Sequence, residues 1–139
     1  MRSRDGQRTW RIGELAAELG MNPRTLRYYE AIGLIPPPRR TSSGYRLYGS
    51  AERERLRFIC KARAIGLSLS EIREILRLRD AGREPCEHVI AMLDRKIADL
   101  DRQIRALERF RRELQALRRR AARRAHRHGA ICGIIEHAA

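Results

Sequence analysis

The sequence is poor in the residues that build covalent frameworks and large cores. Its 139 residues include three cysteines and one tryptophan, and only 5% are aromatic. An odd, small number of cysteines argues against a disulfide scaffold and favours reduced thiols or metal ligands. The sequence has no run of about 18 apolar residues and no apolar signal-peptide core near its N-terminus. We therefore expect a cytoplasmic protein that does not enter a membrane.

Negative charge is also scarce. The chain has 31 Lys and Arg against 17 Asp and Glu, for a net charge of +14. Such an excess indicates a polyanionic partner, most simply nucleic acid. A genome that favours arginine codons would explain the preference for Arg over Lys, but less easily the net charge. No constellation of acid, base or nucleophile is evident, so we expect no enzyme activity.

Two short helices joined by a tight turn are predicted near the N-terminus. In the first, apolar residues recur with helical spacing, at Ile12, Leu15, Ala16 and Leu19. Gly20 is typical of a helix end. Asn22 and Pro23 are typical of the N-cap and first position of the second helix.

The second helix has a basic face and an apolar face. Helical periodicity places Arg24, Arg27 and Tyr28 on one side, and Leu26 and Tyr29 on another. A helix with outward cations is what the major groove of DNA accepts. An ordinary amphipathic surface helix would show the same pattern, and these residues alone leave both interpretations open.

A basic hairpin is predicted over residues 39–48. It contains a Ser-Ser-Gly turn and ends in alternating residues. Arg39, Arg40 and Arg46 would give it a phosphate-binding edge. Because so short a hairpin is unstable alone, it should pack on the neighbouring helices.

Two further helices should complete this region. We expect Ser50 to cap the third helix, and Cys60 to lie on its apolar stripe as a core thiol. Ser68 and Glu71 form a capping-box pattern that opens the fourth helix. Residues 80–85 contain Gly82 and Pro85 and should form a loop that ends the fourth helix.

A long helix is predicted from Cys86 to about residue 124, where the sequence has neither Gly nor Pro. Its apolar residues alternate three and four apart, as in a heptad seam, at Ile90, Leu93, Ile97, Leu100, Ile104 and Leu107. Leaving this narrow stripe in water would be costly. It therefore indicates a homodimer, with a single long surface helix as the alternative.

Four candidate metal ligands lie near the two ends of this helix. Cys86 is at its start, and His126, His128 and Cys132 come after its end. The ends are separated by roughly 50 Å, so these side chains meet only if two helices run antiparallel in a dimer. Thiolates and imidazoles suit a divalent ion such as zinc, or cadmium, lead or mercury. A basic helix end with incidental histidines is the alternative.

Several segments closely resemble the MerR family of transcriptional regulators. They are Ile12 to Ala16, Thr25 to Glu30, Gly33 to Ile35, Gly44 to Tyr48, Ile65 to Ser68 and Glu71-Ile72. The resemblance implies a mainly α fold, with a winged helix-turn-helix domain followed by a long antiparallel coiled-coil dimerisation helix. It also implies binding to double-stranded promoter DNA, and activation by distorting that DNA so that RNA polymerase can use the promoter.

The resemblance also implies roles for single residues. Arg24, Arg27 and Tyr28 would contact DNA from the recognition helix, and Tyr45 and Arg46 from the wing. Cys86 would mark a sensor of divalent ions, with Cys132 and His126 in the sensing loop. The sequence departs from the family at Ala121 and Ala122, where such sensors usually carry further cysteines. Because a three-thiolate mercury site is then missing, zinc is the favoured ion.

We therefore expect five regions. They are a flexible N-terminus (1–9), a DNA-binding domain (10–79), a hinge loop (80–85), a dimerisation helix (86–124), and an effector loop with a C-terminal tail (125–139). Two functions fit them. One is a regulator that responds to a divalent metal, and the other is a metal-independent, architectural DNA-binding protein.

Overall fold

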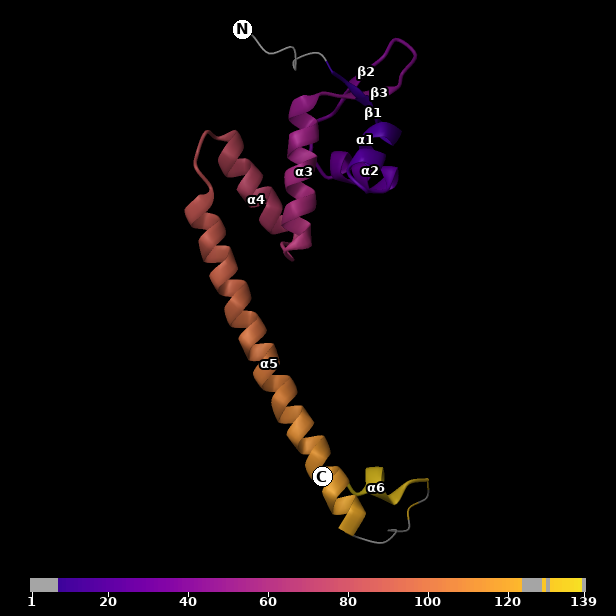
Figure 1. Ribbon diagram of the computed structural model, residues 1–139, viewed down its shortest axis with the longest axis vertical. Helices are drawn as coiled ribbons and strands as arrows, with labels where there is room; N and C mark the ends of the chain where they lie inside the picture. The colour runs from indigo at the N-terminus through magenta and orange to yellow at the C-terminus, as the bar shows by residue number, and fades with distance from the viewer. Residues whose placement is uncertain (1–7, 124–128, 130, 139) are drawn as a thin grey trace. The chain divides into compact units, whose positions relative to one another are not determined.

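The computed structural model describes residues 8–123, 129 and 131–138. The chain divides into two compact units, Met1–Pro85 and Cys86–Ala139. The first contains β1 (Trp10–Arg11), α1 (Ile12–Glu18), α2 (Pro23–Ala31), β2 (Arg39–Arg40), β3 (Arg46–Tyr48), α3 (Ser50–Ala64) and α4 (Leu69–Asp80). The second contains α5 (Cys86–Arg123) and α6 (Gly133–Glu136) (Figure 1). Of the expected flexible N-terminus, residues 1–7 lie outside the described residues.

The strands form a small antiparallel sheet in the order β1-β3-β2. The hairpin expected over residues 39–48 is confirmed, because β2 pairs with β3. The strand β1 was not expected. It pairs with the other edge of β3, with Trp10 opposite Tyr48 and Arg11 opposite Leu47. The sheet thereby joins the hairpin to the residues that precede α1.

Apolar side chains fill the core of the first unit. Those with almost no exposed surface are Leu15, Leu26, Leu34, Ile35, Tyr48, Leu56, Ile59, Leu67 and Ile72, and they come from α1, α2, β3, α3, α4 and the loops between them. Burial, with the Glu30 carboxylate adding to it, raises the pKa of Tyr48 to about 12. The core therefore joins all four helices of this unit to its sheet.

The predicted N-cap is correct for α4 and wrong for α3. The capping box of α4 is confirmed, since the Ser68 N–H donates to Glu71 over 2.7 Å and the Glu71 N–H donates to Ser68 Oγ over 3.1 Å. The expectation that Ser50 caps α3 is wrong. Gly49 is the N-cap, and its N–H donates to the Glu52 carboxylate over 2.8 Å. The Glu52 side chain, in the first turn of α3, thus takes the place of the expected serine cap.

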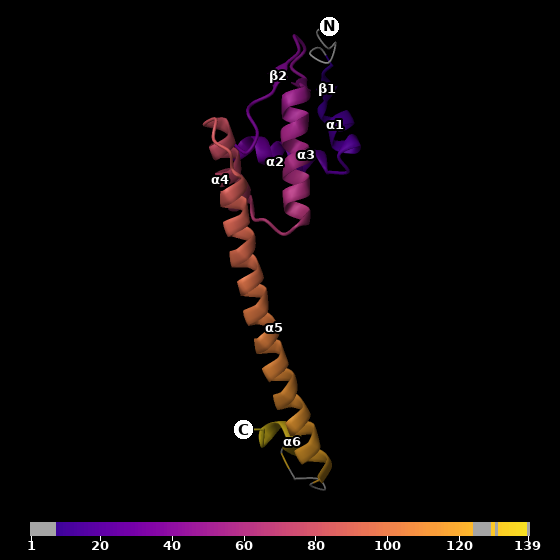
Figure 2. The same cartoon turned by 60° about the vertical axis from the view of Figure 1, so that its left-hand side comes forward.

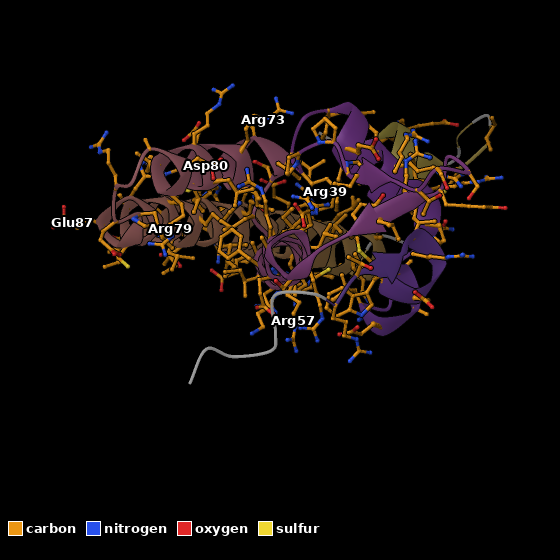
Figure 3. All side chains as sticks on the ribbon, turned by 90° about the horizontal axis from the view of Figure 1, so that it is seen from above. Arg39, Arg57, Arg73, Arg79, Asp80 and Glu87 are labelled. Atoms are coloured by element: carbon orange, nitrogen blue, oxygen red, sulfur yellow. The ribbon has the colours of Figure 1, made fainter. Side chains whose placement is uncertain are left out.

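Two arginines hold the turn that follows α2. Arg55 on α3 donates from Nε to the Leu34 carbonyl over 2.9 Å, and Arg73 on α4 donates to the Ile32 carbonyl over 2.7 Å. The other two nitrogens of Arg55 bind both oxygens of Asp80, the last residue of α4, over 2.7 and 2.9 Å. Figure 3 labels Arg73 and Asp80 on α4. These contacts fix the C-terminal end of α2 against α3 and α4.

The second unit is dominated by α5, an unbroken helix of 38 residues (Figure 2). Its large apolar side chains are between 50% and 67% exposed at Ile90, Ile97, Leu100, Ile104, Leu107, Phe110 and Leu114. Scattered apolar residues are normal on a surface, whereas a continuous stripe of this length marks a surface that binds another molecule. In the described part of the chain, every helix is too short or too polar to cross a bilayer.

The Arg55–Asp80 ion pair predicts a stability that depends on pH. The Arg55 guanidinium holds the pKa of Asp80 below its ordinary value of 3.8. Because the folded pKa is the lower one, this stabilisation is complete above the unfolded pKa and is lost as the pH falls through the folded pKa. We expect Asp80→Asn to lower the free energy of unfolding at pH 7 by up to about 1 kcal/mol, as for other largely exposed pairs.

Urea unfolding at a fixed protein concentration, at pH 7 and at pH 2.5, measures this difference. The difference between the variant and the wild type should be largest at pH 7 and should shrink at pH 2.5, where the unfolded carboxyl is protonated. Glu84→Gln is the matched control, because Glu84 is highly exposed and lies 3.8 Å from Arg79. A loss in Asp80→Asn that is equally large at both pH values would contradict the role of the charged pair.

Candidate nucleic-acid interface and thiol residues

The helix α2 exposes a basic face because its ends and its apolar side are fixed. The Asn22 side chain accepts the Arg24 N–H over 2.9 Å, and Pro23 occupies the first turn. Leu26 and Tyr29 are buried against the core. Every third or fourth residue faces the same way, so the exposed side carries the expected set of Arg24, Arg27 and Tyr28.

This face offers both charge and a planar group. The side chains of Arg24 and Arg27 are exposed, and Tyr28 is 52% exposed with its ring centroid 6.2 Å from that of Tyr29. Arginines can bind a guanine edge or a phosphate, and a tyrosine hydroxyl can bind a phosphate. The chemistry of the face therefore fits a DNA groove.

The second basic surface is the wing, which we define as residues 39–48. Its turn is closed by Thr41 Oγ1, which accepts the Tyr45 N–H over 3.0 Å, and by Arg40, which donates to the Gly44 carbonyl over 2.9 Å. Gly44 has a φ of +85°, a conformation that favours glycine. Arg39, labelled in Figure 3, and Tyr45 are both exposed on this surface.

Arg46 has a different position from the other wing arginines. Its Nε donates to Glu30 Oε2 over 3.0 Å, which joins β3 to α2, and both side chains are partly buried. Arg46 therefore fixes the wing against α2 with at least one of its nitrogens. This pairing could not be predicted from local sequence patterns, because the two residues are 16 positions apart.

Sequence reasoning missed Arg11 as a member of the basic surface. Its guanidinium carbon lies 5.0 Å from the centre of the exposed Tyr45 ring. The contact depends on the pairing of β1 with β3, which brings residue 11 beside the wing. An Arg stacked on a tyrosine is a cation–π contact, and it places one more positive charge next to the wing.

Cys60 is a structural thiol, as its place on the apolar stripe of α3 predicts. It is half-buried, and its sulfur lies 3.9 Å from that of Met21. Burial raises the pKa of Cys60, which keeps the thiol protonated. A protonated thiol is a poor metal ligand, so Cys60 is not a candidate.

The other two cysteines are free thiols in the second unit. Cys86 is exposed at the first residue of α5, and Cys132 is half-buried at the N-cap of α6. The two ends of a 38-residue helix are about 55 Å apart at 1.5 Å per residue. Within residues 8–123, 129 and 131–138, no three His, Cys, Asp or Glu side chains gather as a metal site. His126 and His128 lie outside the described residues.

The donor chemistry of the two thiols fits a divalent ion of borderline or soft character. Thiolates bind zinc, cadmium, lead and mercury in preference to hard ions such as magnesium and calcium. Neither Cys86 nor Cys132 is fully buried, so both can reach a ligand from outside the chain. One chain alone does not bring them together.

Two models of known protein families match this chain. The model of the MerR HTH family regulatory protein matches residues 10–78, and that of the MerR DNA-binding region matches residues 53–117. A relative named as a homolog of the transcriptional regulator ZntR, from Haemophilus influenzae, is 46% identical over 87 residues. That alignment covers 63% of this chain and 64% of the relative. The chain spans less than two thirds of the length of the first curated relatives that it matches.

Two solved structures match along almost their whole length. The lead(II) complex of PbrR691 from Ralstonia metallidurans CH34 is 38% identical, with a TM-score of 0.75 and coverage of 91% of this chain and 96% of that chain. The mercury(II) complex of MerR from Bacillus megaterium MB1 is 35% identical, with a TM-score of 0.64 and coverage of 91% and 97%. The expected fold class, a mainly α winged helix-turn-helix protein with a long dimerisation-type helix, is thereby confirmed. The chain belongs to the MerR family of DNA-binding transcription regulators, which are not enzymes.

Proposed function

We propose that this chain is a metal-responsive regulator that binds promoter DNA as a homodimer. Membership of the MerR family supports the DNA-binding part. The metal part is supported by two free thiols of suitable chemistry in the second unit, and by similarity to structures that contain lead(II) and mercury(II). The observation that carries the proposal is the exposed apolar stripe of α5 with Cys86 at its head.

In this proposal α2 is the recognition helix and the wing grips the DNA backbone. Arg24, Arg27 and Tyr28 enter the major groove, and Arg39 and Tyr45 contact phosphate and sugar. Arg46 shares its guanidinium between Glu30 and the DNA, so its main effect is to hold the wing and the recognition helix together. The net charge of +14 supplies the general attraction to DNA.

The dimer follows from the stripe on α5. A second copy of the same helix presents the same apolar residues and can cover the stripe by a twofold axis. An antiparallel arrangement places Cys86 of one chain beside the loop that contains His126, His128 and Cys132 in the other. Cys86 of one chain and Cys132 of the other would supply thiolate ligands for a divalent ion. Zinc is the favoured ion, with cadmium, lead and mercury as alternatives.

In this proposal, metal binding changes the shape of the bound promoter DNA. A dimer that holds two half-sites can bend and untwist the duplex between them, and the cost of that distortion depends on how rigidly the two domains are held. Cys86 of one chain and Cys132 of the other, at the ends of α5, would change this rigidity when they hold a divalent ion. RNA polymerase would then be able to use a promoter whose elements are otherwise badly spaced.

The recognition helix predicts a base-specific loss. We expect Arg27→Ala to weaken binding to a duplex selected from a random pool by the wild type by about 1–3 kcal/mol. Binding to unselected DNA should change much less, because a base contact is lost and not a general charge. Fluorescence anisotropy at one salt concentration measures both. Arg95→Ala, an exposed arginine on α5, is the control, and equal losses on both duplexes would reduce Arg27 to a phosphate contact.

The thiols predict a metal site that needs both cysteines. Reduced wild-type protein should bind one zinc ion per chain in competition with a chromophoric chelator. Cys86→Ser and Cys132→Ser should each abolish this binding, because a thiolate ligand is lost. Cys60→Ser is the matched control, since that thiol lies in the core of the other unit. Wild-type protein that binds neither zinc nor lead(II) at micromolar concentration would favour a metal-independent, architectural DNA-binding protein.

A mixed dimer separates a shared site from a site within one chain. In a dimer of Cys86→Ser with Cys132→Ser, one site has lost both thiols and the other retains both. We therefore expect the mixed dimer to bind one zinc ion, whereas each homodimer binds none. A mixed dimer without zinc would exclude ligands from two chains.

A further inference from the structure

The segment after α5 is held by a carboxylate from the short helix that follows it. Glu136 is the last residue of α6, and its Oε1 accepts two backbone N–H groups, from Ile131 over 2.8 Å and from Cys132 over 3.2 Å. The second of these belongs to a proposed metal ligand. One carboxylate oxygen thus fixes the backbone on both sides of the Ile131–Cys132 peptide bond.

A glycine allows the carboxylate to approach this closely. A Cβ added to Gly129 would lie 2.7 and 2.8 Å from the N and Cα of Gly133, and would collide with the second oxygen of Glu136. Contacts this short do not occur for real Cβ atoms, so any other residue would have to open the segment. Gly129, Gly133 and Glu136 therefore lie against one another beside Cys132, and we call the described residues Gly129 and 131–136 the carboxylate-closed loop.

Among the described residues, the other bonds to Cys132 are neutral ones within the turn of α6, where its carbonyl accepts the Ile135 and Glu136 N–H groups, each over 3.1 Å. The helix α6 has four residues, which is far too short to be stable by itself. Its apolar neighbours are poorly buried, with Ile131 96% exposed and Ile135 72% exposed. Hydrogen bonds to a charged acceptor are about twice as strong as neutral ones, so the two bonds to Glu136 are the main described constraint on Cys132.

We propose that Glu136 is a positioning residue for metal binding, which holds Cys132 in place before the ion arrives. The inference rests on the metal site proposed above and adds a residue to it. Groups that fix a ligand's orientation commonly change metal affinity by 10–100-fold without touching the metal. Because the backbone of Cys132 is already fixed, its thiolate loses less conformational freedom when it binds.

A glutamate so close to a metal ligand could instead bind the metal itself, and two substitutions separate the roles. Glu136→Gln keeps an oxygen at the same place that can accept both N–H groups, but it removes the charge and makes a poor ligand. Glu136→Ala removes the acceptor altogether. A positioning role predicts a small loss in the first and a large loss in the second, whereas a ligand role predicts a large loss in both.

The experiment measures zinc affinity by chelator competition on the reduced, full-length protein, and repeats it with lead(II). We expect Glu136→Ala to raise the Kd by about 10–100-fold, and Glu136→Gln to raise it less than about fivefold. Gly129→Ala should resemble Glu136→Ala, because it opens the same loop. Glu108→Ala is the control, since Glu108 is exposed on α5 next to Leu107 and far along the chain from the loop.

A second readout does not need the metal. Amide hydrogen exchange of the metal-free protein should show protection at Ile131 and Cys132 that is lost in Glu136→Ala and retained in Glu136→Gln. An unchanged Kd in Glu136→Ala, or equal losses in the Gln and Ala variants, would overturn the positioning role while the metal site stands. If the wild type binds neither ion, the metal site and the positioning role both fall, and protected amides would then show a purely structural loop.

Discussion

The feature on which the rest of the molecule depends is an apolar stripe without a partner. Along α5, seven large side chains from Ile90 to Leu114 are at least half exposed, and within the described part of the chain nothing covers them. A second copy is the simplest cover, because a twofold axis brings the same stripe onto itself. Since the helix is about 55 Å long, the direction of that second copy decides which chemical groups meet at its ends. In the proposed dimer, the thiol site and the spacing of the two DNA-binding domains both follow from this one packing choice.

The positive charge of the chain has two uses that composition alone does not separate. Part of it faces outward on α2 and the wing, where Arg24, Arg27 and Arg39 are exposed. Another part faces inward onto backbone carbonyls, where Arg55 and Arg73 hold the turn after α2. Some of the 31 Lys and Arg residues therefore serve the fold and are not free to bind DNA. The inward arginines nevertheless serve the same end, because they fix the direction in which the outward ones point.

Features set by local periodicity could be predicted from the sequence, and features set by long-range pairing could not. The helical stripes predicted the helices, and the Ser68–Glu71 pattern predicted its capping box, because both depend on residues within one or two turns. The strand β1 was missed, since two residues are too few to show alternation and only the pairing with β3 creates it. The Arg46–Glu30 contact was missed for the same reason. For the metal site, residue types suggested Cys86 and Cys132, but the closure of the loop by Glu136 depends on backbone geometry that has no sequence signature.

The position of Cys86 relative to the stripe links this thiol to whatever covers α5. The helix α5 begins at this residue, directly after Pro85, and Ile90 and Leu93 follow at i+4 and i+7. Helical periodicity therefore places the thiol on the same side of the helix as the apolar stripe, and not on the charged side. Any molecule that covers the stripe to its N-terminal end must then also approach the thiol. The side on which Cys86 lies is set by its spacing of four residues from Ile90. The proposed dimer and the access to Cys86, the proposed first metal ligand, thus depend on one helical face.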